Sequence, residues 1–185
     1  LPNWNHPLTM PNVIPPANIA AIIAAMMTEV FSSNIIEGEY SWKVAAAELE
    51  SAAMLARLVG WDPYTSRGLY TFGGSGCYFY GLKYALTRVL GLQSRLTGIR
   101  TDAKILVSQQ GHYCRENATD WSGLGMDNIV EVKTDIHTNA MDPQNLEEKL
   151  KAFHDQGIPV VSVICTMGTT DANAFDPVAN VRELI

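Results

Sequence analysis

The chain has 185 residues, of which 47% are hydrophobic and 17% are charged, as expected of a globular protein with a buried core. Its formal net charge is −6 with acidic and basic residues interspersed, so no basic stripe exists to bind nucleic acid. The cysteines, Cys77, Cys114 and Cys165, lack the CxxC spacing of zinc sites and disulfide-rich modules. We therefore expect no metal site and no disulfide framework, and the cysteine usage favours a reducing cytoplasm.

The most apolar stretch, IAAIIAAMM at residues 19–27, does not predict a membrane protein. It is far shorter than the roughly 20 apolar residues that span a bilayer, and it lacks the basic segment that opens a signal peptide. We interpret it as part of a helix, over residues 17–31, that is buried in a core or an interface.

The first sixteen residues, LPNWNHPLTMPNVIPP, contain five of the nine prolines and cannot form a regular helix or a central strand. They predict an extended arm that depends on a neighbour for its order. A second helix is predicted over residues 42–59. The arm and the two helices together make a predicted N-terminal region, 1–62, followed by an α/β region, 63–185.

The α/β region begins with an apolar run at 69–72, a predicted strand, and continues through GGSG into a helix that ends near residue 90. Further strands are predicted at 103–108 and 129–132, with a helical segment at 111–124 between them. Asp142 and Pro143 give the next helix an N-cap and a proline in its first turn, and Leu146, Leu150 and Phe153 line one face of it.

The run VVSVIC at 160–165 lacks alternation, which is typical of a strand covered on both faces, and a last helix is predicted from Pro177. About four strands alternating with helices predict an α/β layer with a largely parallel sheet.

The segment Gly73-Gly74-Ser75-Gly76 is a candidate anion site because it precedes a helix. Glycines let successive N–H groups point outward, and the helix N-terminus adds a partial positive charge, so phosphate is a suitable ligand. A tight turn without a ligand is the alternative. The segment matches neither a Walker loop nor a dinucleotide fingerprint nor a GxSxG hydrolase elbow.

Two more polar turns follow predicted strands. His112 comes after the strand at 103–108, and Gly168-Thr169-Thr170 comes after the strand at 160–165. Each has a purely structural alternative: the histidine could cap the next helix, and the threonines could satisfy local backbone groups. Since ligands of α/β sheets bind at the carboxyl ends of the strands, we expect the three turns to converge on one crevice.

These residues lie in segments that resemble the signatures of group II pyridoxal-phosphate-dependent amino-acid decarboxylases. YTFGGS at 70–75 resembles the phosphate-binding turn of that family. HYC at 112–114, with ATDWSGLG at 118–125, is similar to its cofactor-stacking histidine and the helix that follows. TMGTT at 166–170, with FDP at 175–177, resembles the next signature, and Trp42 with AELE at 47–50 is similar to the helix before the large domain.

The resemblance implies a fold, a cofactor and an activity. The fold would be part of the large domain of fold-type I pyridoxal-phosphate enzymes, a three-layer α/β/α structure with a mostly parallel sheet and a helical N-terminal arm. The activity would be pyridoxal-phosphate-dependent decarboxylation of an L-amino acid. The protein would be a cytoplasmic homodimer whose arm wraps the partner, with no nucleic acid or membrane partner.

The resemblance also assigns roles to residues. Gly74, Ser75 and Gly76 would bind the cofactor phosphate. His112 would stack on the cofactor ring as the catalytic residue, and Thr170 would lie under the ring near its polar edge.

The chain departs from the family pattern at four positions and lacks two further family motifs. Cys77, Tyr78, Cys114 and Asn117 differ from the residues that the family favours there. The family's Asp-x-Ala segment, which pairs with the pyridine nitrogen, and its His-Lys pair, which holds the Schiff-base lysine, do not occur. We therefore expect the chain to be the N-terminal portion of such an enzyme and inactive by itself.

Two alternatives to a decarboxylase stay open. Another fold-type I pyridoxal-phosphate enzyme, a lyase or an aminotransferase, would use a similar phosphate turn. A non-catalytic module could use the same scaffold for dimerisation or binding.

Overall fold

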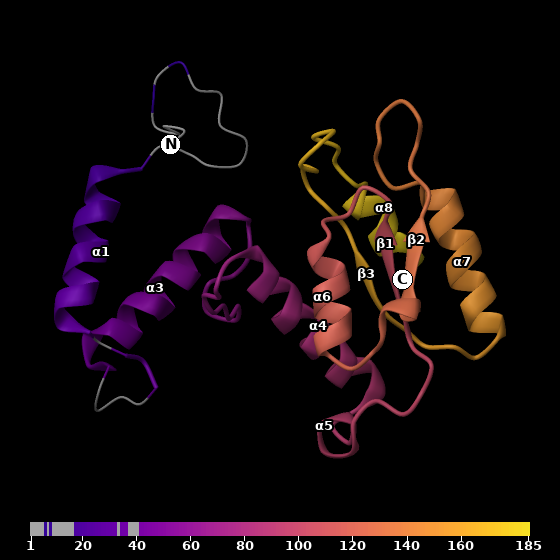
Figure 1. Ribbon diagram of the computed structural model, residues 1–185, viewed down its shortest axis with the longest axis horizontal. Coiled ribbons are helices and arrows are strands. Elements are labelled where there is room, and N and C mark those ends of the chain that lie inside the picture. Colours follow the sequence, from indigo (N-terminus) through magenta and orange to yellow (C-terminus); the bar gives the residue numbers. More distant parts are fainter. Residues whose placement is uncertain (1–5, 7, 9–16, 33, 37–40) are drawn as a thin grey trace. The chain divides into compact units, whose positions relative to one another are not determined.

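The computed structural model describes residues 6, 8, 17–32, 34–36 and 41–185 (Figure 1). The chain divides into two compact units, Leu1–Thr71 and Phe72–Ile185. The boundary that the sequence analysis places between residues 62 and 63 remains a prediction. Most of the predicted proline-rich arm lies outside the described residues.

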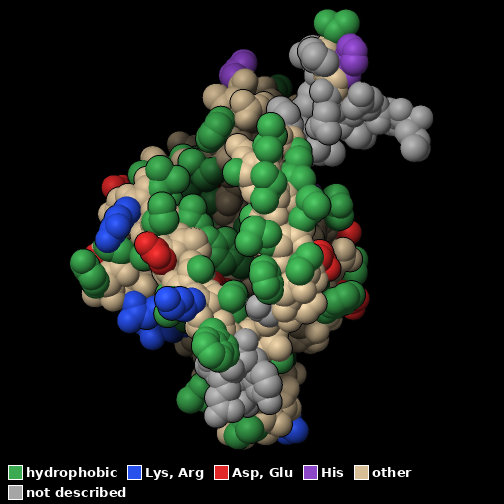
Figure 2. Space-filling view, turned by 90° about the vertical axis from the view of Figure 1, so that its left-hand side faces the viewer, with side chains coloured by type: hydrophobic (Ala, Val, Ile, Leu, Met, Phe, Trp, Pro, Cys, Tyr) green, Lys and Arg blue, Asp and Glu red, His purple; other side chains and the backbone are tan. Residues whose placement is uncertain are grey.

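The first unit contains two of the predicted helices, α1 (Ile19–Phe31) and α3 (Lys43–Leu58). The Asn18 side chain caps α1 by accepting a hydrogen bond from the Ala20 N–H at 2.9 Å. No residue of α1 is buried. Its exposed side chains include Ile19, Ile22, Ile23, Met26, Met27, Val30 and Phe31, and Figure 2 shows how densely hydrophobic side chains cover one face of the molecule.

Across the residues that the structure describes, no helix combines the length and the hydropathy needed to cross a membrane.

The second unit alternates helices and strands. Its strands are β1 (Lys104–Ser108), β2 (Ile129–Val132) and β3 (Val160–Ile164). Its helices are α4 (Gly74–Leu90), α5 (Ser94–Thr97), α6 (Cys114–Trp121), the short 3-10 helix η1 (Met126–Asn128), α7 (Pro143–Asp155) and α8 (Val178–Leu184).

The predicted strand at residues 69–72 is wrong, because these residues form no strand in the structure. A strand needs a neighbouring strand to satisfy its backbone groups, and no described strand pairs with this segment. The Tyr70 N–H instead points to Glu48 Oε1 at 3.5 Å. The glycine turn is therefore entered from an irregular segment.

The sheet has the order β2-β1-β3, and β1 pairs in parallel with both neighbours. This confirms the predicted parallel sheet, with three strands among the described residues where about four were expected. Ile105 pairs with Ile129 on one side and with Ser162 on the other. The central strand β1 is buried on both faces, as its continuous apolar sequence indicates.

Two hydrophobic clusters lie on opposite faces of the sheet, which confirms the three-layer architecture. Ile105 packs with Leu82 and Leu86 of α4 and with Ala118 of α6. The next residue of β1, Leu106, belongs to the other cluster, which contains Val132, Met141, Leu146 and Val181. Adjacent strand residues point to opposite faces, so one strand supplies both cores. Figure 1 shows α6 and α7 on opposite sides of the strands.

Helix α7 begins and ends as predicted. The Asp142 side chain accepts a hydrogen bond from the Gln144 N–H at 2.9 Å, and Pro143 occupies the first turn. The helix ends before Gly157, whose φ of 67° is left-handed. The chain then enters β3 and, past its carboxyl end, reaches one of the candidate turns.

Candidate active site at the carboxyl ends of the strands

His112 lies in the turn between β1 and α6, and its side chain caps the helix. The imidazole Nδ1 accepts a hydrogen bond from the Cys114 N–H at 3.1 Å, and the ring lies 4.2 Å from that of Tyr113, centroid to centroid. An accepting Nδ1 places the proton of the neutral ring on Nε2. The structural alternative considered from sequence is therefore present, and it leaves Nε2 for a ligand.

The turn after β3 is closed by hydrogen bonds between its two ends. Gly168 N–H and Thr169 N–H both donate to the Ala174 carbonyl, at 2.9 and 3.0 Å. The Thr169 hydroxyl accepts a hydrogen bond from the Ala174 N–H at 3.0 Å, and Thr169 is buried. Gly168 has a φ of 101°, which favours glycine. The hydroxyl of Thr169 is thus used inside the turn.

Thr170 differs from Thr169 in its surroundings. It is exposed, and its hydroxyl forms no hydrogen bond with any part of the chain that the structure describes. Of the two threonines, Thr170 is the one whose hydroxyl is available to a bound molecule.

A pocket of about 430 Å³ brings His112 and Thr170 together. The β1–α6 turn contributes Gln110, Gly111, His112 and Tyr113, and the turn after β3 contributes Thr166, Gly168, Thr169, Thr170 and Asp171. Both turns follow the carboxyl ends of parallel strands, where α/β sheets bind their ligands. Two of the three turns expected to converge therefore share one pocket.

Gly74, Ser75 and Gly76 form the first turn of α4 and are not among the residues that line this pocket. Their N–H groups precede the first helical bond, from the Cys77 N–H to the Gly73 carbonyl at 3.2 Å. Gly73 has a φ of 93°, which turns the chain into the helix.

The beginning of α4 nevertheless lies beside the carboxyl end of β3. Cys77 and Tyr78 share a hollow of about 350 Å³ with Ile164 and Cys165. The glycine turn thus lies at the same end of the sheet as the pocket.

A larger hollow of about 590 Å³ lies along β3, lined by residues such as Leu150, Ile158 and Val161. Its polar side chains, Lys151, His154 and Ser162, come from α7 and β3 and not from the turns at the carboxyl ends of the strands. We therefore place the candidate site in the smaller pocket.

Burial raises the pKa of three groups close to these turns. Desolvation raises the pKa of Tyr78 to about 12, and the nearby Asp176 carboxylate adds to this effect. Desolvation, with the same carboxylate, raises the pKa of the Cys165 thiol to about 11, and burial also raises the pKa of the Cys114 thiol. Cys114 and Cys165 are therefore protonated at neutral pH and poor nucleophiles.

Within the described residues, no group of three or more His, Cys, Asp or Glu side chains could hold a metal ion.

Two residues that the sequence analysis did not single out hold the pocket turns in place. Arg115 donates to the carbonyls of the β1–α6 turn, and Asp176 accepts hydrogen bonds from the N–H groups of Met141 and Thr166, each at 2.7 Å. One signal for Arg115 was present, because its partner Glu131 interrupts the apolar strand IVEV. The bond from Asp176 to Met141 spans 35 residues and leaves no local signal.

Comparison with known proteins decides the family. The model of the pyridoxal-dependent decarboxylase conserved domain matches residues 2–185. The chain belongs to the pyridoxal-dependent decarboxylase family. The resemblance described from the sequence is thereby confirmed, and the family's cofactor is pyridoxal phosphate.

Curated relatives of this family member include two decarboxylases of acidic substrates. The chain is 24% identical over 182 residues to the acidic amino acid decarboxylase GADL1 of Homo sapiens, covering 97% of the chain and 34% of the relative. It is 27% identical over 167 residues to the cysteine sulfinic acid decarboxylase of Homo sapiens, covering 86% of the chain and 33% of the relative. The chain thus spans about a third of the length of these relatives.

Solved structures confirm the fold. The crystal structure of mouse CSAD matches with a TM-score of 0.85 at 24% identity, over 94% of this chain and 36% of that one. The crystal structure of Oryza sativa TDC with PLP and tryptamine matches with a TM-score of 0.80 at 23% identity, over 90% and 36% of the two chains. These neighbours confirm the prediction of a fold-type I α/β unit.

Proposed function

We propose that the protein carrying this chain is a pyridoxal-phosphate-dependent carboxy-lyase of an L-amino acid, and that this chain forms part of its cofactor site. The observation that carries the proposal is the pocket shared by His112 and Thr170. A family member with an imidazole and an available hydroxyl at the carboxyl ends of two parallel strands has polar groups where such a cofactor can be oriented.

The residues present fit pyridoxal phosphate. A volume of about 430 Å³ is in the range of pockets for small cofactors. The N–H groups of Gly74, Ser75 and Gly76, with the Ser75 hydroxyl, would hold the phosphate at the N-terminus of α4, a helix of 17 residues. When bound, the cofactor supplies a pyridinium ring that accepts the electrons released as the carboxylate leaves.

His112 and Thr170 would orient the reactants. The bond from the Cys114 N–H fixes the imidazole, so that its face can stack on a planar ring and its Nε2 can hold or deliver a proton. Thr170 would donate or accept one hydrogen bond at the polar edge of the ring. Tyr113, which stacks on His112 and is itself exposed, would help to keep water away from the imidazole.

We also propose that the protein acts as a cytoplasmic homodimer. The proposal of a second copy is supported by α1, which is apolar around most of its circumference and has no buried residue. A helix that is hydrophobic all round is normally covered. Equilibrium sedimentation of the natural protein tests the dimer, and a Met26→Lys, Val30→Lys variant should dissociate it.

The test of the proposed function is binding and turnover in the natural protein with added pyridoxal phosphate. Ser75→Ala should weaken cofactor binding by the value of a charge-assisted hydrogen bond, roughly 1.5–3 kcal/mol. His112→Phe should keep the cofactor and lose most release of carbon dioxide, because the imidazole proton is lost and a flat ring is kept.

The matched control is Ser94→Ala, at the start of α5, whose hydroxyl donates to the Gly91 carbonyl at 2.7 Å. It should bind the cofactor like the wild type. Wild-type cofactor affinity in Ser75→Ala would remove Ser75 from the phosphate site, and absence of cofactor binding by the wild-type protein would overturn the proposed function.

A further inference from the structure

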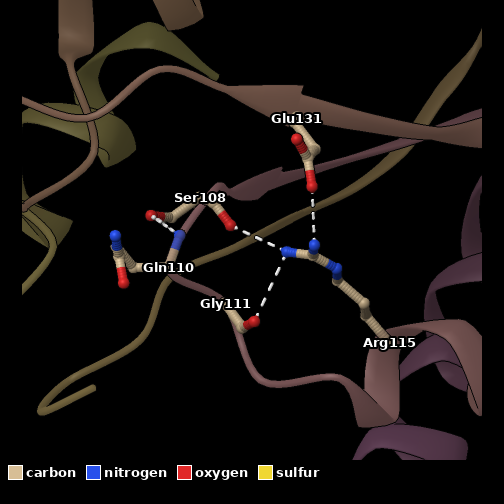
Figure 3. Close-up of polar contacts among 5 residues, drawn as sticks. All are labelled: Ser108, Gln110, Gly111, Arg115 and Glu131. Atoms are coloured by element: carbon tan, nitrogen blue, oxygen red, sulfur yellow. Dashed lines mark hydrogen bonds and ion pairs between the residues drawn. The ribbon is translucent and has the colours of Figure 1, made fainter. Parts of the chain in front are cut away.

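Arg115, in the first turn of α6, has its guanidinium surrounded by three oxygen acceptors (Figure 3). Nη1 donates to the Ser108 carbonyl at 3.0 Å and to the Gly111 carbonyl at 3.4 Å, and Nη2 lies 2.6 Å from Glu131 Oε1. The Arg115 side chain is only 11% exposed. One side chain thus links the end of β1, the turn after it and the adjacent strand β2.

The turn is closed so tightly that only glycine fits at position 111. A Cβ there would lie 2.5 Å from Val107 Cγ2 and 2.9 Å from the Ser108 carbonyl oxygen, and 3.3 Å from the Arg115 guanidinium. The Gly111 N–H already donates to the same Ser108 carbonyl at 2.7 Å. Gly111 is therefore enclosed between the strand and the guanidinium.

Stability alone does not account for this arrangement. A nearly buried cation loses much of its hydration, and the removal of water can cost as much as the ion pair contributes. Arg115 Nε is also buried, without a hydrogen-bond partner among the described residues. Because Arg115 leaves one donor unsatisfied while its other nitrogens bind two carbonyls, we infer that it contributes to the geometry of the turn more than to stability.

The residue that follows this closed turn is His112. Its imidazole lies against the pocket, and its Nδ1 is fixed by the Cys114 N–H, one residue before Arg115. His112 is therefore held on both sides. Arg115 binds the carbonyl of the preceding residue, Gly111, and the Cys114 N–H of α6 binds the imidazole ring.

We propose that Arg115, tethered by Glu131, is a positioning residue that holds the Gly111–His112 turn so that the imidazole faces the pocket. The expected effect of Arg115 on catalysis rests on the function proposed above, whereas its expected effect on the turn does not. Arg115 touches neither the cofactor nor the substrate in this proposal, and it acts through His112.

The first test measures the turn itself, by amide hydrogen exchange in the natural protein without added cofactor. Arg115→Met keeps an unbranched side chain as far as the position of Nε and removes the guanidinium donors, so exchange across residues 109–114 should speed up at least about tenfold. Glu131→Gln keeps an acceptor and removes the charge, and it should produce a smaller acceleration in the same segment.

The matched control is Lys151→Met. Lys151 pairs with Glu147 at the same 2.6 Å, but its side chain is 71% exposed and it lies on α7. It should leave exchange at 109–114 unchanged. Wild-type exchange at 109–114 in Arg115→Met would overturn the proposal, and so would an acceleration spread equally over both hydrophobic clusters.

The second test separates positioning from folding in the protein loaded with pyridoxal phosphate. Arg115→Met should lower kcat by about 10- to 100-fold, because misplacing a catalytic group by a fraction of an ångström to an ångström costs that much. KM and cofactor affinity should stay within about twofold, and the circular dichroism of the bound cofactor should change. Wild-type kcat and dichroism would contradict the proposal.

The two proposals fail separately. If the wild-type protein binds no pyridoxal phosphate, the proposed function is wrong, and the exchange result still decides whether Arg115 holds the turn. If cofactor binding and turnover are present but Arg115→Met matches the wild type in exchange, only the positioning role is overturned.

Discussion

The turn after β1 and the turn after β3 are each held by one ionic side chain, the nearly buried Arg115 and the buried Asp176, which have opposite charge. Arg115 gathers the carbonyls of Ser108 and Gly111, whereas Asp176 gathers the N–H groups of Met141 and Thr166. Arg115 thus supplies donors to backbone carbonyls and Asp176 supplies acceptors to backbone N–H groups.

The contacts of Asp176 and of Arg115 differ in the sequence distance that they span and in how far they are buried. Asp176 is 2% exposed and accepts two 2.7 Å bonds, one of them from Met141, 35 residues away, whereas one partner of Arg115, Glu131, has a side chain that is 49% exposed. We therefore expect Asp176 to contribute more to stability and Arg115 more to local geometry.

Asp176→Ala should have the largest effect. It removes two charge-assisted hydrogen bonds and leaves two N–H groups without an acceptor, so the free energy of opening at Met141 and Thr166 should fall by about 3 kcal/mol or more. Amide hydrogen exchange measures this. The exposed Asp171, in the same turn, supplies the control, since Asp171→Ala should leave both amides protected as in the wild type. Equal effects of the two variants would remove Asp176 from its structural role.

Thr169→Val should have a smaller effect confined to the β3 turn. The Ala174 N–H loses its 3.0 Å bond to the hydroxyl while the shape of the side chain is kept, which should cost about 1 kcal/mol at that amide. Thr170→Val is the matched control and should not change the exchange of Ala174. A loss as large as that of Asp176→Ala would mean that the hydroxyl, and not the carboxylate, fastens this turn.

Tyr78 gives the finest comparison, because both charges act on its phenol. Burial raises its pKa to about 12; Arg115 lowers this value and Asp176 raises it. A phenol whose pKa is raised by folding contributes stability that is present below pH 10 and lost as the pH rises towards 12. Tyr78→Phe should remove this part of the alkaline loss, as followed by melting temperature between those pH values.

The pKa of Tyr78 should shift in opposite directions when Arg115 or Asp176 loses its charge. Phenolate absorbance, taken as the difference from Tyr78→Phe, should show a higher pKa in Arg115→Met and a lower one in Asp176→Asn. Shifts in the same direction would show that general loosening, and not charge, controls the pKa of Tyr78.

Elements whose signals are local were predicted from the sequence. The continuous apolar runs gave β1 and β3, and Asp142 with Pro143 gave the start of α7. The run at 69–72 has the same apolar character but forms no strand, since strand formation depends on a partner that the run itself does not encode. Local pattern therefore identified β1, β2 and β3 and failed at the entry to α4.

In the candidate site, too, features with local signals were predicted and features that depend on distant residues were not. The meeting of His112 and Thr170 was predictable, because parallel strands present their carboxyl ends at one edge of the sheet. The roles of Arg115 and of Asp176, which the sequence analysis named only within the FDP segment, were not predicted, because they depend on hydrogen bonds between side chains and distant backbone groups. The preference for Thr170 over Thr169 came from the resemblance, and the burial of the Thr169 hydroxyl supports it.

Glu131 also has a consequence for how the sheet assembles. It lies opposite Val107 in the parallel pairing of β1 with β2, on the face where α6 packs. A slip of one residue would turn its carboxylate towards α7 and leave a valine against the Arg115 guanidinium. Misaligned pairing would thus leave the charges of Arg115 and Glu131 on opposite faces of the sheet, each without its partner. The ion pair therefore favours the observed alignment of the two strands over a shift by one residue.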